Sequence, residues 1–230
     1  MSIKGVLFDL EGTLVERSLN DPEVFHKVLE WKGLQIQIEE IEKAVSKVKM
    51  ELGDMIEGQC GKIPRLDYHN LWNLNILKVL GVEDHDRSIL REVSDQWIDI
   101  CGLTLQPDAK FTLTNLKANG LKTGIVSGAY EEEVQRILEI VELDEAFFDV
   151  LVGSDTIKRK KPAPEVFRYA LNQLKIKPEE SLYVGNDLKR DYRAAERAGI
   201  IPFLFLKSDE ILPCDIRKIK NLISLMDYID

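Results

Sequence analysis

Two carboxylates stand one residue apart near the start of the chain, directly after a short apolar run. They are Asp9 and Glu11, in a segment that a glycine and a threonine then close. A carboxylate can attack phosphorus and form an acyl phosphate. A second carboxylate can give a proton to the leaving oxygen and later activate water. Together with suitable partners, the pair could therefore carry out phosphoryl transfer, in which Asp9 would be the nucleophile and Glu11 the acid and base.

Other polar groups that such a reaction needs stand far along the chain. Ser127 and Lys161 can hold phosphate oxygens, and Asp187 and Asp191 add two more carboxylates. Two anions that approach each other need a cation between them. Asp9 and an acidic group near Asp187 could hold Mg²⁺, which prefers oxygen ligands.

Each of these residues has a plainer interpretation when it is taken alone. Asp9 and its neighbouring acid are consistent with a polar turn, and Ser127 with the cap of a following helix. The basic run 158–161 reads as a solvated stretch of charge, and Asp187 and Asp191 as acids that the helix dipole favours. These residues can form a site only if the elements that carry them bring them together.

The elements expected around these residues alternate between strand and helix. Apolar runs predict strands, and amphipathic segments predict helices. The expected strands are 3–8, 122–126, 148–152, 181–184 and 201–206, and the helices 108–119, 131–141, 164–174, 191–198 and 216–229. This alternation predicts an α/β fold with a doubly wound, Rossmann-like parallel sheet. Ligands of such sheets bind beyond the carboxyl ends of the strands, where the polar residues fall.

The stretch between the first two expected strands has a different pattern. Its apolar residues recur at spacings of three and four, as in the stripe of Ile41, Val45, Val48 and Leu52. Glycines break the stretch into four expected helices at 22–31, 38–55, 66–80 and 86–101. We expect a four-helix insert within the α/β core.

Composition limits the classes of partner. The 230 residues carry a net charge of −9, which argues against a nucleic-acid partner. Three scattered cysteines suggest neither a disulfide framework nor a zinc site, and the three histidines all fall in the insert without metal spacing. The N-terminus lacks the apolar region of a signal peptide, and no apolar run could span a bilayer, so we expect a cytoplasmic protein without a membrane partner.

Taken in order, these polar clusters resemble the four motifs of the haloacid dehalogenase superfamily, over nearly the whole chain. The resemblance implies that Asp9 is the nucleophile and a metal ligand, and that the backbone carbonyl of Glu11 is a second ligand. It implies that Ser127, with Gly128, and Lys161 bind the transferring phosphoryl group. The resemblance to the family's phosphatases implies Mg²⁺ as the cofactor.

The resemblance also divides the chain. It implies a Rossmann-like catalytic core at 1–14 and 106–230, and a helical cap domain at 15–105. Caps of this kind close over the site, select the substrate and exclude water.

The sequence departs from the family pattern at two positions. Glu11 stands where the phosphatases usually have Asp, which lengthens the acid–base side chain by one methylene. True dehalogenases carry no carboxylic acid there, so Glu11 argues against dehalogenation. Asn186 stands where Asp is common, and we expect the next residue, Asp187, to ligate the metal because it is charged. Asn186 and Asp191 stay as alternatives.

The function expected from these observations is a Mg²⁺-dependent phosphatase that acts on a small phosphorylated metabolite. The departures keep open a catalytically weakened member of the family that binds or regulates, and a phosphomutase or phosphonatase relative is a further alternative. The sequence names neither the substrate nor the oligomeric state.

Overall fold

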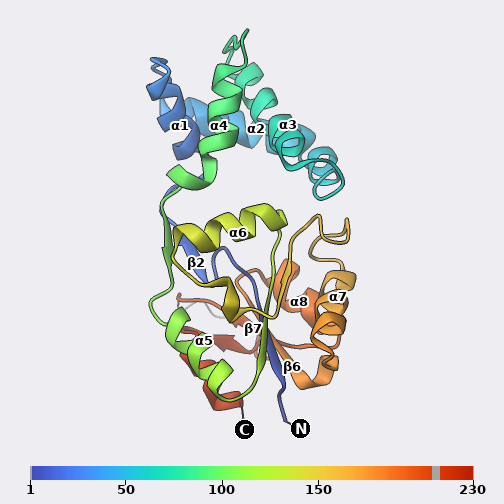
Figure 1. Ribbon diagram of the computed structural model, residues 1–230. Helices are drawn as coiled ribbons and strands as arrows, with labels where there is room; N and C mark the ends of the chain where they lie inside the picture. The colour runs from blue at the N-terminus through green and yellow to red at the C-terminus, as the bar shows by residue number, and fades with distance from the viewer. Residues whose placement is uncertain (1, 209–212, 230) are drawn as a thin grey trace. The chain divides into compact units, whose positions relative to one another are not determined.

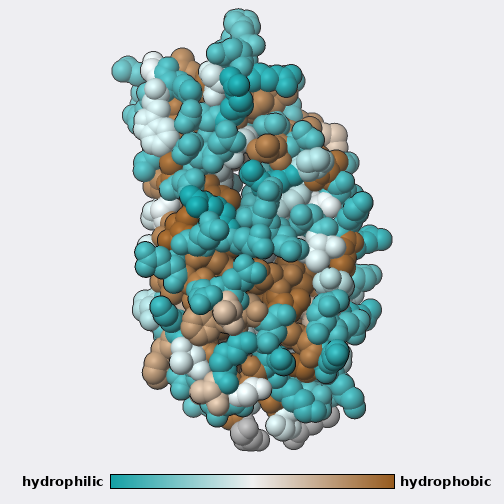
Figure 2. Space-filling view, in the orientation of Figure 1, coloured by the Kyte–Doolittle hydropathy of each residue, from teal (hydrophilic) through white to brown (hydrophobic). Residues whose placement is uncertain are grey.

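The computed structural model describes residues 2–208 and 213–229. The chain divides into two compact units, which Figure 1 shows along the colour gradient. The core unit consists of Met1–Glu16 and Thr104–Asp230, and the insert is Arg17–Leu103. On the face drawn in Figure 2, hydrophilic side chains predominate and apolar ones show between them.

A six-stranded sheet forms the centre of the core unit. Its strands are β1 (Gly5–Phe8), β4 (Lys122–Val126), β5 (Val150–Val152), β6 (Ser181–Gly185), β7 (Ile201–Phe205) and β8 (Lys218–Ile219). Their order is β5-β4-β1-β6-β7-β8, and every neighbouring pair is parallel. The chain runs outward from β1 in both directions, so the connections reverse between β1 and β6. The predicted doubly wound α/β class is confirmed, and ligand sites in such sheets lie at this reversal.

Burial explains why the central strands form. The strand β1 is buried along its whole length, with no polar alternation, as expected for a strand that is covered on both faces. The helices of this unit are α5 (Ala109–Ala118), α6 (Glu131–Ile140), α7 (Pro164–Leu174) and α8 (Arg193–Arg197). In Figure 1, α5 lies on one side of the sheet and α7 and α8 on the other. Leu7, Val126 and Phe167 belong to one buried cluster between the sheet and its helices.

The end of the chain differs from the sequence prediction. A helix over 216–229 is wrong, because this stretch contains β8 and then a 3₁₀ helix at Ile223–Tyr228. The N–H of Leu204 donates to the carbonyl of Arg217, and the N–H of Leu206 to that of Ile219, at 2.8 and 3.0 Å. Pairing with β7 therefore overrides the local helical pattern.

The helix predicted at 191–198 begins earlier and is irregular. A π-helical turn spans Leu188–Tyr192 and runs directly into α8. Two short strands, β2 (Val15–Arg17) and β3 (Leu103–Leu105), were not predicted. They pair with each other where the chain passes between the two units. The division seen here, at 16/17 and 103/104, lies two residues from each predicted boundary.

The insert contains four helices among the described residues, each within two residues of its predicted bounds. They are α1 (Asp21–Trp31), α2 (Ile38–Glu57), α3 (Arg65–Val79) and α4 (Ser88–Ile100). A reciprocal capping box between Asn20 and Glu23 starts α1, and the predicted stripe of α2 buries Ile41 and Val48. No helix of the described residues is long and apolar enough to cross a membrane. The role of the insert as a cap stays a prediction.

Candidate active site

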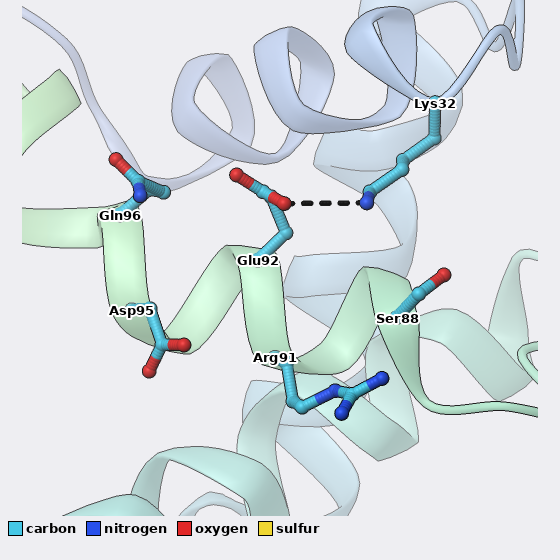
Figure 3. A pocket seen from close by; sticks show the side chains of 6 residues that line it. All are labelled: Lys32, Ser88, Arg91, Glu92, Asp95 and Gln96. Atoms are coloured by element: carbon cyan, nitrogen blue, oxygen red, sulfur yellow. Dashed lines mark ion pairs between the residues drawn. The ribbon is translucent and has the colours of Figure 1, made fainter.

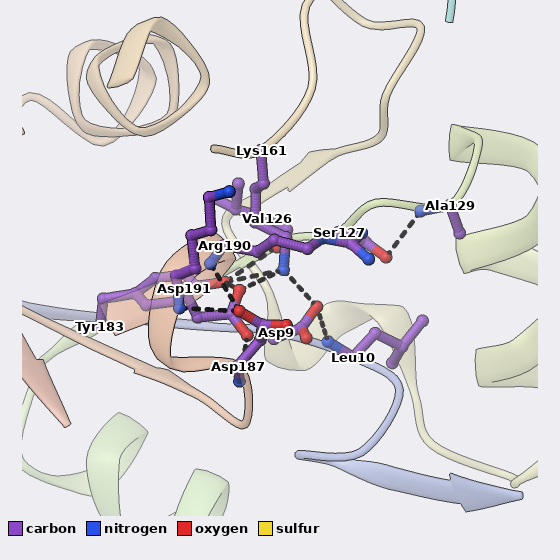
Figure 4. A network of polar contacts seen from close by, with 11 residues as sticks. Asp9, Leu10, Val126, Ser127, Ala129, Lys161, Tyr183, Asp187, Arg190 and Asp191 are labelled. Carbon is purple, nitrogen blue, oxygen red and sulfur yellow. Dashed lines mark hydrogen bonds and ion pairs between the residues drawn. The ribbon is translucent and has the colours of Figure 1, made fainter. Parts of the chain in front are cut away.

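Lys161 lies at the centre of a buried polar cluster in the core unit (Figure 4). Its Nζ is 2.7 Å from Oδ1 of Asp9 and 2.6 Å from Oδ1 of Asp191, and it donates to the hydroxyl of Tyr183 at 3.1 Å. The side chains of Lys161 and Asp191 are only 2% and 1% exposed. Buried charges are costly unless they are paired, so this cluster is a specific arrangement and not a surface contact. Three segments far apart in the sequence meet here.

Asp9 follows β1 directly and continues its ladder, because its N–H donates to the carbonyl of Val184 in β6 at 2.8 Å. Its Oδ1 accepts from the N–H of Leu10 at 2.8 Å and contacts Lys161. Its Oδ2 accepts no hydrogen bond from the described residues. Burial raises the pKa of the Asp9 carboxyl to about 7; the Lys161 charge opposes this shift and the Asp191 charge adds to it.

The loop after β1 packs closely on the loop after β6. Gly12 has a φ of +77°, and a Cβ there would stand 2.1 Å from Nδ2 of Asn186. A side chain at this position would therefore both strain the backbone and displace the side chain of Asn186. Glu11, next to Gly12, is half-buried and forms a bridge with Val15.

Asp191 is turned inward by the π-helical turn after β6. Its Oδ1 contacts Lys161 and the Tyr183 hydroxyl, and its Oδ2 accepts from the N–H of Asp187 at 2.9 Å. This close approach requires Gly185, where a Cβ would lie 2.4 Å from Cβ and Cγ of Asp191. Both carboxylate oxygens are engaged, which favours a role in positioning Lys161 over metal ligation.

Asp187 fits both interpretations given above, because one of its oxygens caps a turn and the other is left for a ligand. Its Oδ1 accepts from the N–H groups of Lys189 and Arg190 at 2.8 and 2.6 Å, so it caps the turn. Its Oδ2 accepts no hydrogen bond within the part of the chain that is described. Asp187 is half-buried, whereas Asn186 is exposed.

Ser127 follows β4 and is 4% exposed. Its N–H donates to the carbonyl of Val152 at 2.9 Å, and its Oγ accepts from the N–H of Ala129 at 3.1 Å. The N-cap of α6 is Tyr130, so Ser127 is not the cap of that helix. The Ser127 hydroxyl keeps its proton available to donate to a ligand.

The basic run 158–161 separates into two kinds of residue. Lys158 and Arg159 are exposed and Lys160 is half-buried, as expected for a solvated stretch. Lys161 alone in this run is buried and enters the polar cluster.

Tyr183 is a site residue that sequence reasoning missed. It is fully buried in β6, and its hydroxyl lies 3.2 Å from the carbonyl oxygen of Val126 and 3.0 Å from Oδ1 of Asp191. Burial raises the pKa of Tyr183 well above its usual value, so the phenol stays protonated. The signal in the sequence was a phenol between two apolar residues, Leu182 and Val184, in the strand before the fourth motif.

The oxygen atoms of this cluster fit a hard divalent cation. Residues 2–208 and 213–229 contain no group of three His, Cys, Asp or Glu side chains suited to a metal. The donor set expected here is different, because it combines two carboxylates with a backbone carbonyl. Asp9 and Asp187 each keep one oxygen without a hydrogen bond, and oxygen donors are the kind that Mg²⁺ takes.

A separate hollow of about 250 Å³ lies on the insert (Figure 3). It is lined by Lys32, Ser88, Arg91, Glu92, Asp95 and Gln96. The Nζ of Lys32 forms an ion pair with Glu92 at 3.2 Å, with both side chains about one-third exposed. The hollow contains none of the residues predicted to act in catalysis.

The haloacid dehalogenase-like hydrolase family matches residues 3–199. The chain belongs to this family. Phosphoglycolate phosphatase of Aquifex aeolicus is 28% identical over 227 residues, which cover 96% of each chain. Glyceraldehyde 3-phosphate phosphatase of Methanocaldococcus jannaschii is 26% identical over 236 residues, with 97% of each chain covered.

Solved structures share the fold of this family member. The HAD-hydrolase YfnB of Bacillus subtilis, solved with magnesium bound, has a TM-score of 0.74 at 18% identity over the full length of both chains. A HAD phosphatase of Thermococcus onnurineus has a TM-score of 0.66 at 23% identity, over 98% of this chain and 97% of the other. The predicted family, its fold and an enzyme of the phosphohydrolase class are thus confirmed.

Proposed function

We propose that this enzyme is a Mg²⁺-dependent phosphatase that hydrolyses a small phosphorylated metabolite through an aspartyl-phosphate on Asp9. The observation that carries the proposal is the Lys161 ammonium, which is held between Asp9 and Asp191 at 2.7 and 2.6 Å at the strand ends. It fixes one oxygen of the Asp9 carboxylate and leaves the other without a hydrogen bond from the described residues.

The proposed reaction has two steps. In the first, an oxygen of Asp9 forms a bond to phosphorus while the bond from phosphorus to the leaving oxygen breaks. Glu11 gives its proton to that oxygen. In the second step, Glu11 takes a proton from water, the water attacks phosphorus, and inorganic phosphate leaves with the Asp9 carboxylate restored.

The remaining residues hold the phosphoryl group and the nucleophile. Ser127 donates its hydroxyl proton to a phosphate oxygen, and Gly128 contributes to the same loop. Lys161 offers positive charge beside the nucleophile, and Asp191 and Tyr183 fix the position of its ammonium. A group held in place in this way costs no reorganisation during the reaction.

The residues that would hold Mg²⁺ are Asp9, the carbonyl of Glu11 and Asp187. Asn186 offers a neutral oxygen as the alternative to Asp187. When bound, the cation supplies Lewis-acid stabilisation of negative charge between the nucleophile and the phosphate. Asp191 is a weaker candidate for ligation, because both its oxygens are engaged.

The substrate class follows from the relatives. The two phosphatases described above are named for phosphoglycolate and glyceraldehyde 3-phosphate, which are both small phosphorylated metabolites. We extend that class, but neither individual substrate, to this chain. We also propose that the insert acts as the cap that selects the substrate, and that the enzyme works in the cytoplasm.

The test measures hydrolysis of para-nitrophenyl phosphate by wild type and two variants. Each protein is assayed once in the presence of Mg²⁺ and once in the presence of EDTA. Wild type turns over only with Mg²⁺, and Asp9→Asn loses turnover by at least about 1,000-fold while keeping its fold, because the nucleophile is gone. Asp227→Asn, the same change on an exposed carboxylate, retains activity. Hydrolysis retained by Asp9→Asn refutes the nucleophile. An inactive wild type that still binds phosphate supports the weakened binding protein instead.

A further inference from the structure

A cation to which the family resemblance assigns no role, Arg190, lies beside the phosphate-binding loop. Arg190 belongs to the π-helical turn after β6, and its guanidinium reaches Gly128 in the loop after β4. A Cβ on Gly128 would stand 2.6 Å from Nη2 of Arg190 and 3.9 Å from its Cζ. Figure 4 draws Arg190 in the same cluster as Ser127. The guanidinium thus lies next to Gly128, which directly follows Ser127, the residue whose hydroxyl we propose to bind the phosphoryl group.

The Arg190 side chain is exposed. Within residues 2–208 and 213–229, its guanidinium forms no hydrogen bond and no ion pair. Its five N–H donors are therefore free to bind a ligand. Its charge also acts on the Tyr183 hydroxyl, where it opposes the rise in pKa that burial causes. The guanidinium is therefore close to the buried cluster and also open to solvent.

The charges at the strand ends show why another cation is useful. Asp9 and Asp191 share a single buried ammonium, that of Lys161. Asp187 adds a third carboxylate in the loop after β6. The whole chain carries a net charge of −9. A phosphate ester brings further negative charge to this place. A planar guanidinium is suited to bind its oxygens in a bidentate manner.

We infer that Arg190 is a second anchor for the phosphoryl group and donates to its non-bridging oxygens next to the Ser127 hydroxyl. The inference rests on the proposed function and deepens it. Because Arg190 contacts the phosphoryl group and not the leaving group, its contribution is the same for every phosphate monoester. Gly128 leaves room for the guanidinium by having no side chain.

The test compares Arg190→Gln with Lys189→Gln, an exposed cation on the same turn whose replacement changes the net charge equally. The measurements are kcat/KM for several phosphate monoesters and Ki for inorganic phosphate, both with Mg²⁺. Arg190→Gln lowers kcat/KM by about 10- to 100-fold for every ester and raises Ki similarly, the usual size for a charged hydrogen bond. Lys189→Gln stays within about two-fold of wild type, because an exposed charge acts only through a screened field.

Two kinetic results overturn the inference. Equal losses in the two variants mean that Arg190 acts only through net charge. A loss confined to esters with a second anionic group means that Arg190 binds the leaving group. If wild type hydrolyses no ester, the proposed function fails on its own, and calorimetric titration with inorganic phosphate decides the inference. Weaker binding by Arg190→Gln alone supports it, and equal binding or no binding by all three proteins contradicts it.

Discussion

Two lysines of this molecule are in opposite electrostatic settings. Lys161 of the core unit is 2% exposed and contacts two carboxylates, whereas Lys32 of the insert is 29% exposed and contacts one. An exposed ion pair costs little to form and contributes little, because water solvates both partners. A buried one carries a desolvation penalty that stability alone does not justify. The contrast supports our proposal that the core cluster serves chemistry, and the exposed ion pair gives no such reason to propose a site at the hollow on the insert.

The largest expected effect comes from removing the buried cation. Lys161→Met leaves Asp9 and Asp191 buried together without a counter-charge, and we expect a loss of about 3–5 kcal/mol of unfolding free energy. Urea denaturation at neutral pH measures this loss. Arg159→Met, an exposed residue of the same basic run, serves as the control and stays within about 0.5 kcal/mol. Equal urea midpoints for the two variants would show that the buried ion pairs of Lys161 contribute no more to stability than an exposed residue does.

The next largest effect, at Glu11 in the core unit, is expected in the rate of catalysis and not in stability. Glu11→Gln keeps the backbone carbonyl that we propose as a ligand and removes the acid–base group. We expect kcat to fall by about 100-fold or more, with the urea midpoint and the Mg²⁺ dependence unchanged. Steady-state kinetics over a series of Mg²⁺ concentrations measures both. An unchanged kcat would exclude Glu11 from proton transfer.

A smaller effect is expected at the hydroxyl that the sequence did not predict. Tyr183→Phe removes a contact to Lys161 and one to Asp191, and it leaves buried polar groups less satisfied. We expect a loss of about 1–3 kcal/mol and a lower kcat, read from urea unfolding and from the aryl phosphate assay. Tyr169→Phe is the matched control, because its hydroxyl has no hydrogen bond across the described residues. A Tyr183→Phe protein indistinguishable from this control would remove Tyr183 from the positioning network.

The smallest effect is expected in the insert. Lys32→Met breaks the ion pair with Glu92, and we expect a change of no more than about 1 kcal/mol that shrinks further in high salt. Urea unfolding at low and high ionic strength measures it. A loss as large as that of Lys161→Met would show that the exposed ion pair contributes as much to stability as the buried ones.

Sequence reasoning found those parts of the fold that repeat a pattern locally. The strand at 122–126 and the helix at 164–174 have the predicted bounds, because hydrophobic periodicity and a leading proline mark them. The helix predicted at 216–229 failed, because pairing with β7 is a contact between distant segments. The π-helical turn was not predicted either; it carries Asp191, whose contact with Lys161 joins segments that are distant in the sequence.

The same limit holds for the site. Motif spacing predicted that Asp9, Ser127 and Lys161 share one site, and the structure places Asp9 and Lys161 in direct contact. Spacing could not show that Asp191 is fully engaged or that the Tyr183 hydroxyl joins the cluster, because both facts depend on side-chain packing across strands. The roles of these residues in catalysis remain predictions.

Trapping the phosphorylated enzyme tests the central claim most directly. Wild type is mixed with a phosphate ester and Mg²⁺, quenched in acid within one turnover, reduced with borohydride and digested for mass spectrometry. Reduction of an acyl phosphate converts aspartate to homoserine. Our account predicts that this change appears at residue 9, and that it is absent without substrate or in Asp9→Asn. An active enzyme with unmodified Asp9, or with the change at another carboxylate, would contradict it.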